Sequence, residues 1–316
     1  MSKGCSKSNC ASNKSGSCGS ADAMIAQQDM AIKTSLGRIK NKILVMSGKG
    51  GVGKSTVSVN LALGLAQRGH RVGLMDVDLH GPDICRMLNL SDRLQERQIK
   101  DGKVPPMQFN DNLKVISLEY MMENRDDPII WRGPLKIQAI RQFVSDMDWG
   151  ELDYLIIDSP PGTGDEPLTV ASTIKDAEAL VVTTPQDVAL ADVRKSINFC
   201  KHVKMKVLGV VENMSGFICP HCSRQVDIFK TGGGEKMAAE FGVPFLGRIP
   251  VDPKVVTGGD AGAPYLSSNA ATPATEAFAG VLDKVEKKGR EKKVSLATVG
   301  SGCACGETCD PNLCSC

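Results

Sequence analysis

The chain has 316 residues, of which 41% are hydrophobic and 23% charged, an ordinary composition for a globular protein. Its 38 lysines and arginines against 36 aspartates and glutamates leave a net charge of +2, which gives no electrostatic reason to expect nucleic acid as a partner. No apolar run reaches the roughly 18 residues that a membrane span needs, and the polar first twenty residues contain no signal-peptide core. We therefore expect a cytoplasmic protein without a membrane or nucleic-acid partner.

The predicted elements alternate between helices and strands along most of the chain. Residues 1–22 are polar and rich in Ser, Gly, Lys, Asn and Cys, so we expect a flexible tail there, followed by a lead-in helix over residues 23–40. An apolar strand over residues 43–47 then leads through a glycine-rich turn into a helix over residues 55–67. Further short strands are expected at 72–75, 155–157, 179–182, 207–211 and 245–249, with helices between them and a last helix at 272–287.

This alternation predicts an α/β fold with a doubly wound, mostly parallel sheet and helices on both faces. The chain then divides into three parts. Residues 1–37 form a Cys-containing tail with the lead-in helix, and residues 38–287 form the α/β domain. Residues 288–316 form a charged linker and a second flexible Cys-rich tail.

A phosphate-binding motif, GxxxxGK[ST], lies between the first strand and its helix. It consists of Gly48, Lys49, Gly50, Gly51, Val52, Gly53, Lys54 and Ser55, with Thr56 next in the helix. Glycines let backbone N–H groups wrap a phosphate, and the helix N-terminus adds a partial positive charge. We expect Lys54 to bridge the β- and γ-phosphates of a nucleotide and the Ser55 hydroxyl to bind Mg²⁺.

Carboxylates follow two other strands. Asp76 and Asp78 end one strand, and Asp158 ends the strand LIID. The carboxyl ends of parallel strands lie beside the phosphate loop. Asp158 is expected to hold Mg²⁺ through water, and Asp78 to orient or deprotonate the attacking water. Asp76 either supports the hydration shell of the metal or only caps a helix. Gly162 and Gly164 are expected to hinge a loop that senses the γ-phosphate.

Twelve cysteines are unevenly distributed along the chain. Cys219 and Cys222 form a CxxC motif, whereas Cys85 and Cys200 stand alone and are expected to be small core residues. The remaining cysteines are near the two ends: Cys5, Cys10 and Cys18, and Cys303, Cys305, Cys309, Cys314 and Cys316. In a cytosolic protein such groups indicate metal or redox chemistry before disulfides. One CxxC supplies two thiolates, whereas zinc or a [4Fe-4S] cluster typically takes four, so a two-fold symmetric dimer would complete the site.

The loop KGGVGKST resembles the deviant Walker A motif of the MinD, ParA and nitrogenase-iron-protein class. Five longer segments resemble the Mrp family of P-loop ATPases, iron–sulfur cluster carriers also called ApbC in bacteria. They are HGPDICRML (80–88), WRGP (131–134), WGELDYLIIDSPPGTGDEPLT (149–169), TTPQDVAL (183–190) and VVENMSGFICPHC (210–222). The resemblance extends over about residues 23–287.

The resemblance implies a slow ATPase whose nucleotide is ATP, held with Mg²⁺. Lys49, Lys54 and Asp78 would be catalytic, with Lys49 reaching the nucleotide of the partner subunit in a homodimer. Three further residues would lie near the base: Asn213 against adenine, and Pro250 and Asp252 in a loop beside it. The guanine-reading NKxD motif does not occur at Asn213, which favours ATP over GTP.

For the cysteines, the resemblance implies that Cys219 and Cys222 hold a labile [4Fe-4S] cluster between two subunits, for transfer to apo iron–sulfur proteins. The tails depart from the family. Three N-terminal cysteines stand where eukaryotic relatives have a four-cysteine motif, which puts a stable cluster there in doubt. The C-terminal cysteines are open between an accessory metal or cluster site, a role in handing over a cluster, and no defined ligand.

Three alternatives compete with a cluster carrier. A positioning ATPase of the ParA or MinD type has no use for a CxxC, and MinD-like proteins end in an amphipathic helix where this chain ends in Gly, Ser and Cys. An electron-transfer ATPase like the nitrogenase iron protein takes one cluster cysteine from just after the strand LIID, where this chain has none between Asp158 and Thr173. Zinc is the chemical alternative to a cluster at the CxxC.

Overall fold

The computed structural model describes seven stretches of the chain: residues 18–78, 81–90, 103–117, 133–219, 221–222, 224–268 and 271–300. Most of the tail cysteines lie outside these stretches, namely Cys5, Cys10, Cys303, Cys305, Cys309, Cys314 and Cys316. Cys18 is the first residue of the first helix. The roles predicted for the tail cysteines therefore stay predictions.

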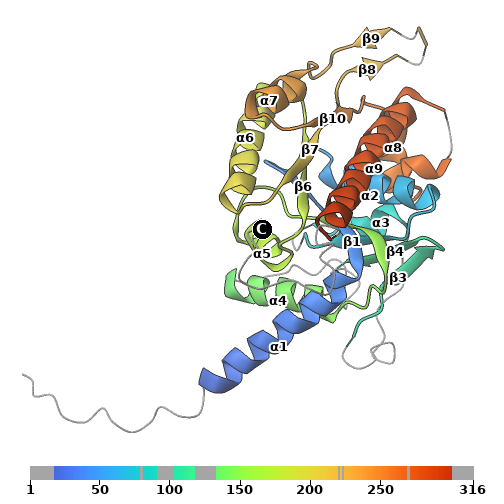
Figure 1. Cartoon of the computed structure of the whole chain (residues 1–316). Helices are drawn as coiled ribbons and strands as arrows, with labels where there is room; N and C mark the ends of the chain where they lie inside the picture. Colours follow the sequence, from blue (N-terminus) through green and yellow to red (C-terminus); the bar gives the residue numbers. More distant parts are fainter. Residues whose placement is uncertain are drawn as a thin grey trace, which may run out of the picture.

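A central eight-stranded sheet organises the fold (Figure 1). Its strands are β1 (Ile39–Ser47), β2 (Val72–Asp76), β3 (Met107–Asn110), β4 (Leu113–Ser117), β5 (Leu152–Asp158), β6 (Glu178–Thr183), β7 (Val207–Glu212) and β10 (Phe245–Arg248). They lie in the order β10-β7-β6-β1-β5-β2-β4-β3. Every neighbouring pair is parallel except β3 with β4. The mostly parallel sheet predicted from the sequence is confirmed.

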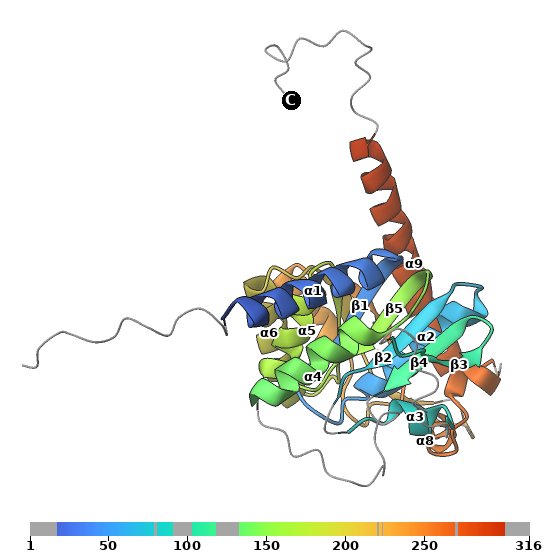
Figure 2. The same cartoon turned by 90° about the horizontal axis from the view of Figure 1, so that it is seen from below.

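Helices cover both faces of this sheet (Figures 1 and 2). One face carries α1 (Cys18–Gly37), α4 (Gly133–Asp146), α5 (Asp165–Thr173), α6 (Asp187–His202) and α7 (Gly233–Phe241). The other carries α2 (Lys54–Gln67), α3 (Ile84–Met87), α8 (Pro253–Asp260), the short 3₁₀ helix Tyr265–Ser268 and α9 (Pro273–Gly300). The doubly wound architecture is therefore confirmed. Among the described helices, none combines the length and apolar character that crossing a membrane requires.

The alternation of side chains along β1 explains why both faces need a cover. Leu44 and Met46 point into the core under α1, α4, α5, α6 and α7, whereas Ile43 and Val45 point into the core under α2 and α9. All four are buried. A strand that is buried on both sides reads as a continuous apolar run, which is why 43–47 was recognisable from the sequence.

Three boundaries differ from the expected ones. Helix α1 begins at Cys18, inside the expected tail, and β1 begins at Ile39, where its pairing with Leu152 on β5 extends the sheet. Helix α9 continues to Gly300, so the first part of the expected charged linker is helical (Figure 2). Its Lys, Arg and Glu residues are good helix formers that need no tertiary packing to favour this conformation. The division of the chain into two tails and a domain stays a prediction.

Candidate nucleotide site and cysteine pair

The glycine-rich loop between β1 and α2 has a backbone that requires its glycines. Gly51 and Gly53 have φ angles of +77° and +80°, in the left-handed region that L side chains rarely adopt. A Cβ at Gly53 would lie 2.2 Å from Nδ2 of Asn213, and one at Gly48 would lie 2.4 Å from the backbone carbonyl carbon of Asp192. The loop is therefore shaped by close backbone approach, as a phosphate cradle must be.

The loop opens onto a cleft of about 610 Å³ at the carboxyl ends of the parallel strands. The cleft is lined by several of the residues that were predicted to bind the nucleotide, namely Lys49, Gly50, Gly51, Gly53, Lys54, Ser55, Thr56 and Asp78. Pro160, Pro161 and Glu166 line it from the loop after β5 and the start of α5. A cleft of this size accommodates a nucleotide, since small-molecule pockets occupy roughly 300–1,000 Å³.

Lys54 lies in a network of carboxylates directly behind the cleft. Its Nζ is 2.7 Å from Oδ2 of Asp158 and 3.7 Å from Oδ2 of Asp78. Burial, the largest effect, lowers the pKa of Lys54, but the charge and hydrogen bond of Asp158 and the charges of Asp78 and Asp76 together raise it above the ordinary value. Lys54 is therefore a fixed cation, the state in which it can bind phosphate.

Asp158 connects the phosphate loop to the helix that follows it. The Ser55 hydroxyl donates to Oδ2 of Asp158 at 2.7 Å, and the Ser58 hydroxyl lies 2.6 Å from Oδ1. The contact with Ser55 places together the two groups expected to hold Mg²⁺. Sequence reasoning missed Ser58, although its position one helical turn after Lys54 puts it on the same face of α2.

Asp76 is a buried carboxylate whose ionisation is disfavoured. Its Oδ1 accepts the backbone N–H of Asp78 at 3.0 Å and its Oδ2 accepts the Ser117 hydroxyl at 3.1 Å. Burial, followed by the charge of Asp158, raises its pKa well above the ordinary range. Even with Asp76 neutral, Asp78 and Asp158 around one ammonium leave an excess of negative charge with oxygen donors, which suits a hard divalent cation such as Mg²⁺.

Replacement of Asp76 by asparagine is expected to stabilise the protein at pH 7–8 in buffer without nucleotide or Mg²⁺. A folded-state pKa above the unfolded one contributes stability that is present at low pH and lost as pH rises through the folded pKa. The amide never ionises, and its oxygen can keep the bond from Asp78 N–H while its NH₂ group donates to the Ser117 hydroxyl oxygen in place of the bond that the carboxylate accepted. We therefore expect a gain of about 1 kcal/mol or more, measured by denaturant unfolding between pH 4 and 8. Asp148→Asn, at an exposed pair with Arg38, is the control and should change stability little. Equal stability of Asp76→Asn and the wild type at pH 8 would contradict the assignment.

The three residues predicted to lie near the base occupy two separate parts of the structure. Asn213 follows β7 and its Nδ2 donates to the backbone carbonyl of Val52 at 2.9 Å, so it supports the phosphate loop. Pro250 and Asp252 do not line the phosphate cleft; they line a smaller cleft of about 270 Å³ together with Cys219. Asp252 also caps α8, accepting from Lys254 N at 2.9 Å. The predicted contacts with the base stay predictions.

The two cysteines of the CxxC motif lie in a hairpin. Figure 1 shows this hairpin, labelled β8 and β9, at the edge of the fold. Its strands are β8 (Phe217–Ile218) and β9 (Gln225–Val226), which pair antiparallel, and Cys219 N donates to the carbonyl of Arg224 at 3.0 Å. Backbone N–H groups of His221 and then Cys222, and next the Cys222 side chain, lower the pKa of the Cys219 thiol. Cys219 is half-buried and Cys222 exposed. A turn that stabilises a thiolate at the surface is suited to ligating a metal.

The two cysteines outside the CxxC motif and the tails lie in the core and not at the surface. Cys85 and Cys200 are buried in the core, as predicted. Burial raises the pKa of Cys200 to about 12, so this thiol is inert. Among the residues that the structure describes, no group of three or more His, Cys, Asp or Glu side chains is arranged to hold a metal ion. Within that part of one chain, the CxxC therefore offers two thiolates for a site that needs more.

A buried glutamate holds both ends of the segment that carries the CxxC. Glu212, the last residue of β7, is fully buried and accepts from the Ser215 hydroxyl at 2.5 Å, from Gly232 N at 2.8 Å and from Gly234 N. The Glu212 carboxylate thus binds both the segment that leaves the sheet after β7 and the segment that enters α7, and the CxxC hairpin lies between these two segments. Sequence reasoning missed Glu212, because only the fold brings its partners together.

Fold and site together define a nucleotide-binding protein of the P-loop class, with a deviant phosphate loop and a CxxC hairpin on one domain. The family model described as ParA, NUBPL iron-transfer P-loop NTPase, matches residues 38–286. This chain belongs to that family.

Relatives and solved structures agree with this assignment. The chain is 46% identical over 277 residues to the iron-sulfur cluster carrier protein of Methanocaldococcus jannaschii, and this match covers 87% of this chain and 94% of the relative. It is 51% identical over 233 residues to the cytosolic Fe-S cluster assembly factor CFD1 of Kluyveromyces lactis, over 72% of this chain and 82% of the relative. The structure of a nucleotide-binding protein from Archaeoglobus fulgidus in complex with ADP superposes with a TM-score of 0.68 at 36% identity, over 79% of this chain and 96% of that one.

Proposed function

We propose that this protein is an ATP-dependent iron–sulfur cluster carrier. It binds a labile [4Fe-4S] cluster as cargo on Cys219 and Cys222 at a homodimer interface and delivers it to apo iron–sulfur proteins. The observation that carries this proposal is a thiolate-stabilising CxxC hairpin built onto a complete phosphate-loop site. The names of the relatives support the cargo. Among the residues that the structure describes, no contact at either site favours a positioning or an electron-transfer ATPase.

The nucleotide site supplies the groups that ATP hydrolysis needs. Lys54 and the loop backbone would bind the phosphates, while Ser55 and Asp158, with Asp76 behind them, would hold Mg²⁺. Bound Mg²⁺ would neutralise charge on the β- and γ-phosphates. Asp78 lines the cleft and lies within 4 Å of Lys54, a position from which it orients the attacking water. Catalysis of this kind is positioning and electrostatics, and slow basal turnover suits a carrier that acts only on engaging a client.

Short contacts connect the two sites. Asn213 bonds the phosphate loop at Val52, and Gly216 accepts from Val251 N at 2.7 Å. Phe217, the next residue, begins the hairpin and makes a bridge to Val251. Cys219 follows two residues later, so a change in the loop backbone on nucleotide binding has a direct route to the cargo site.

The cluster-loaded protein is expected to be a homodimer. One chain contributes two thiolates at the CxxC, and two chains complete the four ligands of a [4Fe-4S] cluster. The Lys49 side chain lines the cleft without a hydrogen bond or ion pair to any described residue, which leaves its ammonium available to a partner's nucleotide. Sedimentation of anaerobically reconstituted protein, with iron and sulfide counted per chain, tests this.

The expected result is a dimer with four irons per two chains. A cluster-loaded monomer that needs both Cys219 and Cys222 would contradict the bridging arrangement. Zinc without sulfide, found after anaerobic preparation, would contradict the cargo and leave the nucleotide site unaffected.

A further inference from the structure

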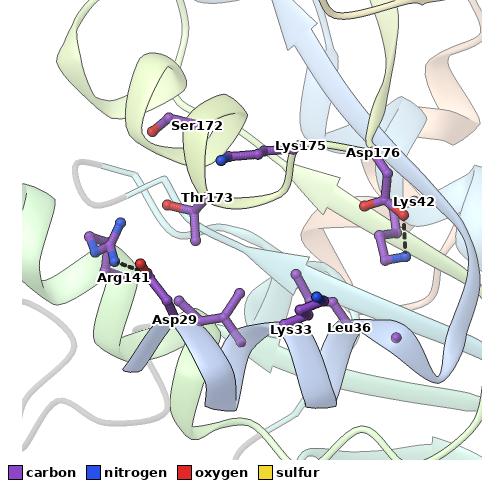
Figure 3. Close-up of a pocket in the computed structure, with 11 residues that line it drawn as sticks. Asp29, Lys33, Leu36, Lys42, Arg141, Ser172, Thr173, Lys175 and Asp176 are labelled. Carbon is purple, nitrogen blue, oxygen red and sulfur yellow. Dashed lines mark hydrogen bonds and ion pairs between the residues drawn. The ribbon is translucent and has the colours of Figure 1, made fainter. Parts of the chain in front are cut away.

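A second cleft, of about 570 Å³, lies between α1 and the end of α5, and the nucleotide site does not use it (Figure 3). One of its residues is Lys42, near the start of β1, whereas the phosphate loop follows the end of that strand. At about 3.3 Å per residue the two sites are roughly 20 Å apart. Helix α1, which forms one wall, precedes the residues that the family model matches.

The cleft carries an excess of positive charge. Its lining includes four cations and two carboxylates, namely Lys33, Lys42, Arg141 and Lys175 with Asp29 and Asp176. Two ion pairs, Arg141 with Asp29 and Lys42 with Asp176, lie at its two ends (Figure 3). Between them, Lys33 on α1 and Lys175 after α5 have no ion pair with any described residue. Two opposed lysines in one concave site favour a ligand with two negative groups.

Lys42 adds a buried donor to this site. Its side chain is 4% exposed, and its Nζ donates to the carbonyl of Ile39 at 2.9 Å and to Oδ2 of Asp176 at 2.7 Å. An ammonium has three N–H donors, and the described residues provide partners for two. Because leaving a buried donor unpaired is costly, the third favours an acceptor in the cleft.

The end of α5 offers acceptors as well. The hydroxyls of Ser172 and Thr173 donate to the carbonyl of Thr169 at 3.0 and 2.6 Å, so their protons are used and their lone pairs remain. The helix also ends here, and its carbonyl end carries partial negative charge. The anionic groups of a ligand therefore lie toward the lysines, and this wall suits an O–H or N–H donor. A phosphate, whose oxygens are almost all acceptors, is poorly matched to it. Ile32 and Leu36 provide apolar lining for a short carbon chain.

We propose that this cleft binds a small dicarboxylic acid that also carries a hydroxyl or amino group. Lys33 and Lys175 hold the two carboxylates, the spare donor of Lys42 adds a hydrogen bond, and Ser172 and Thr173 accept from the hydroxyl or amine.

The test is titration calorimetry on the full chain with the phosphate loop saturated by MgADP, so that anions do not compete for that loop. The probes are malate and aspartate, with succinate lacking the extra donor, pyrophosphate, and a poly-glutamate peptide. We expect malate or aspartate to bind with a Kd of roughly 1 mM or tighter, succinate more weakly, and pyrophosphate and the peptide not measurably. Lys33→Gln/Lys175→Gln should weaken binding by about tenfold or more.

The matched control is Lys195→Gln/Lys236→Gln, which removes the same charge from α6 and α7 and should leave binding unchanged. Thr173→Val should reduce the preference for malate over succinate without affecting affinity for succinate. Absence of binding by both acids, equal weakening in the control, or tighter binding of pyrophosphate or the peptide than of malate would overturn the proposal. Saturation by MgADP is measured separately for each variant, so a loss of nucleotide binding is distinguished from a loss of acid binding at the second cleft.

Discussion

Lys54→Ala is expected to reduce ATP hydrolysis by at least about a hundredfold, the scale for removing one preorganised charge donor from a catalytic site. Lys54 is the cation that Asp158 and Asp78 hold at the base of the cleft, and its pKa is raised, so it is charged at neutral pH. Without it, the phosphates would face Asp78 and Asp158 with less compensating charge. The measurement is steady-state phosphate release under anaerobic conditions, with circular dichroism of each variant.

Two further variants make this prediction decisive. Lys54→Arg keeps the charge balance of the buried network and tests folding, but its wider, planar head should not restore turnover, because arginine and lysine present their donors differently. Asp78→Asn should keep ATP binding and slow turnover, since Asp78 lines the cleft without being the principal partner of Lys54. Lys195→Ala, at an exposed lysine on α6, is the control. Unchanged hydrolysis by folded Lys54→Ala would remove the phosphate loop from the mechanism.

The parts of the molecule that sequence predicts are those encoded locally. The phosphate loop is one continuous motif, and the buried strands are apolar runs that end in the carboxylates Asp76 and Asp158. The two lone cysteines, Cys85 and Cys200, follow from the ordinary preference of a free thiol for the core. These features need no knowledge of what lies across the sheet.

The parts that escaped prediction depend on contacts between distant residues. Glu212 binds Gly232 and Gly234, which approach it only once β7 and α7 are packed. The strand pair β3–β4 is short, and its residues have no strong apolar run. The cleft at Lys33 and Lys175 exists only because α1 packs beside the end of α5. The side chain of Asp252 caps α8 and lines a cleft together with Cys219, neither of which the sequence indicated, and its predicted contact with the base stays a prediction.

Loss of both CxxC thiols is expected to abolish the transferable cluster while ATP binding survives. Cys219→Ser/Cys222→Ser removes the exposed thiol and the one whose pKa the turn lowers, and a serine hydroxyl is a poor ligand for iron. The nucleotide cleft is lined by other residues, so nucleotide affinity should change little. Either single variant leaves two thiolates per dimer, too few for four irons, and should also lose the cluster.

The measurement is iron and sulfide content per chain after anaerobic reconstitution, followed by activation of an apo iron–sulfur acceptor enzyme, with MgATP binding as the folding control. Deleting residues 1–17 or 301–316, which leaves α1 and α9 whole, should retain the cluster at the CxxC. Either deletion lowers total iron only where that tail holds its own site, and we expect this more readily for the five C-terminal cysteines. The serine double variant contains every tail cysteine. If it still activated the acceptor at the wild-type level, the transferable cluster would lie in the tails, and the hairpin would need another role.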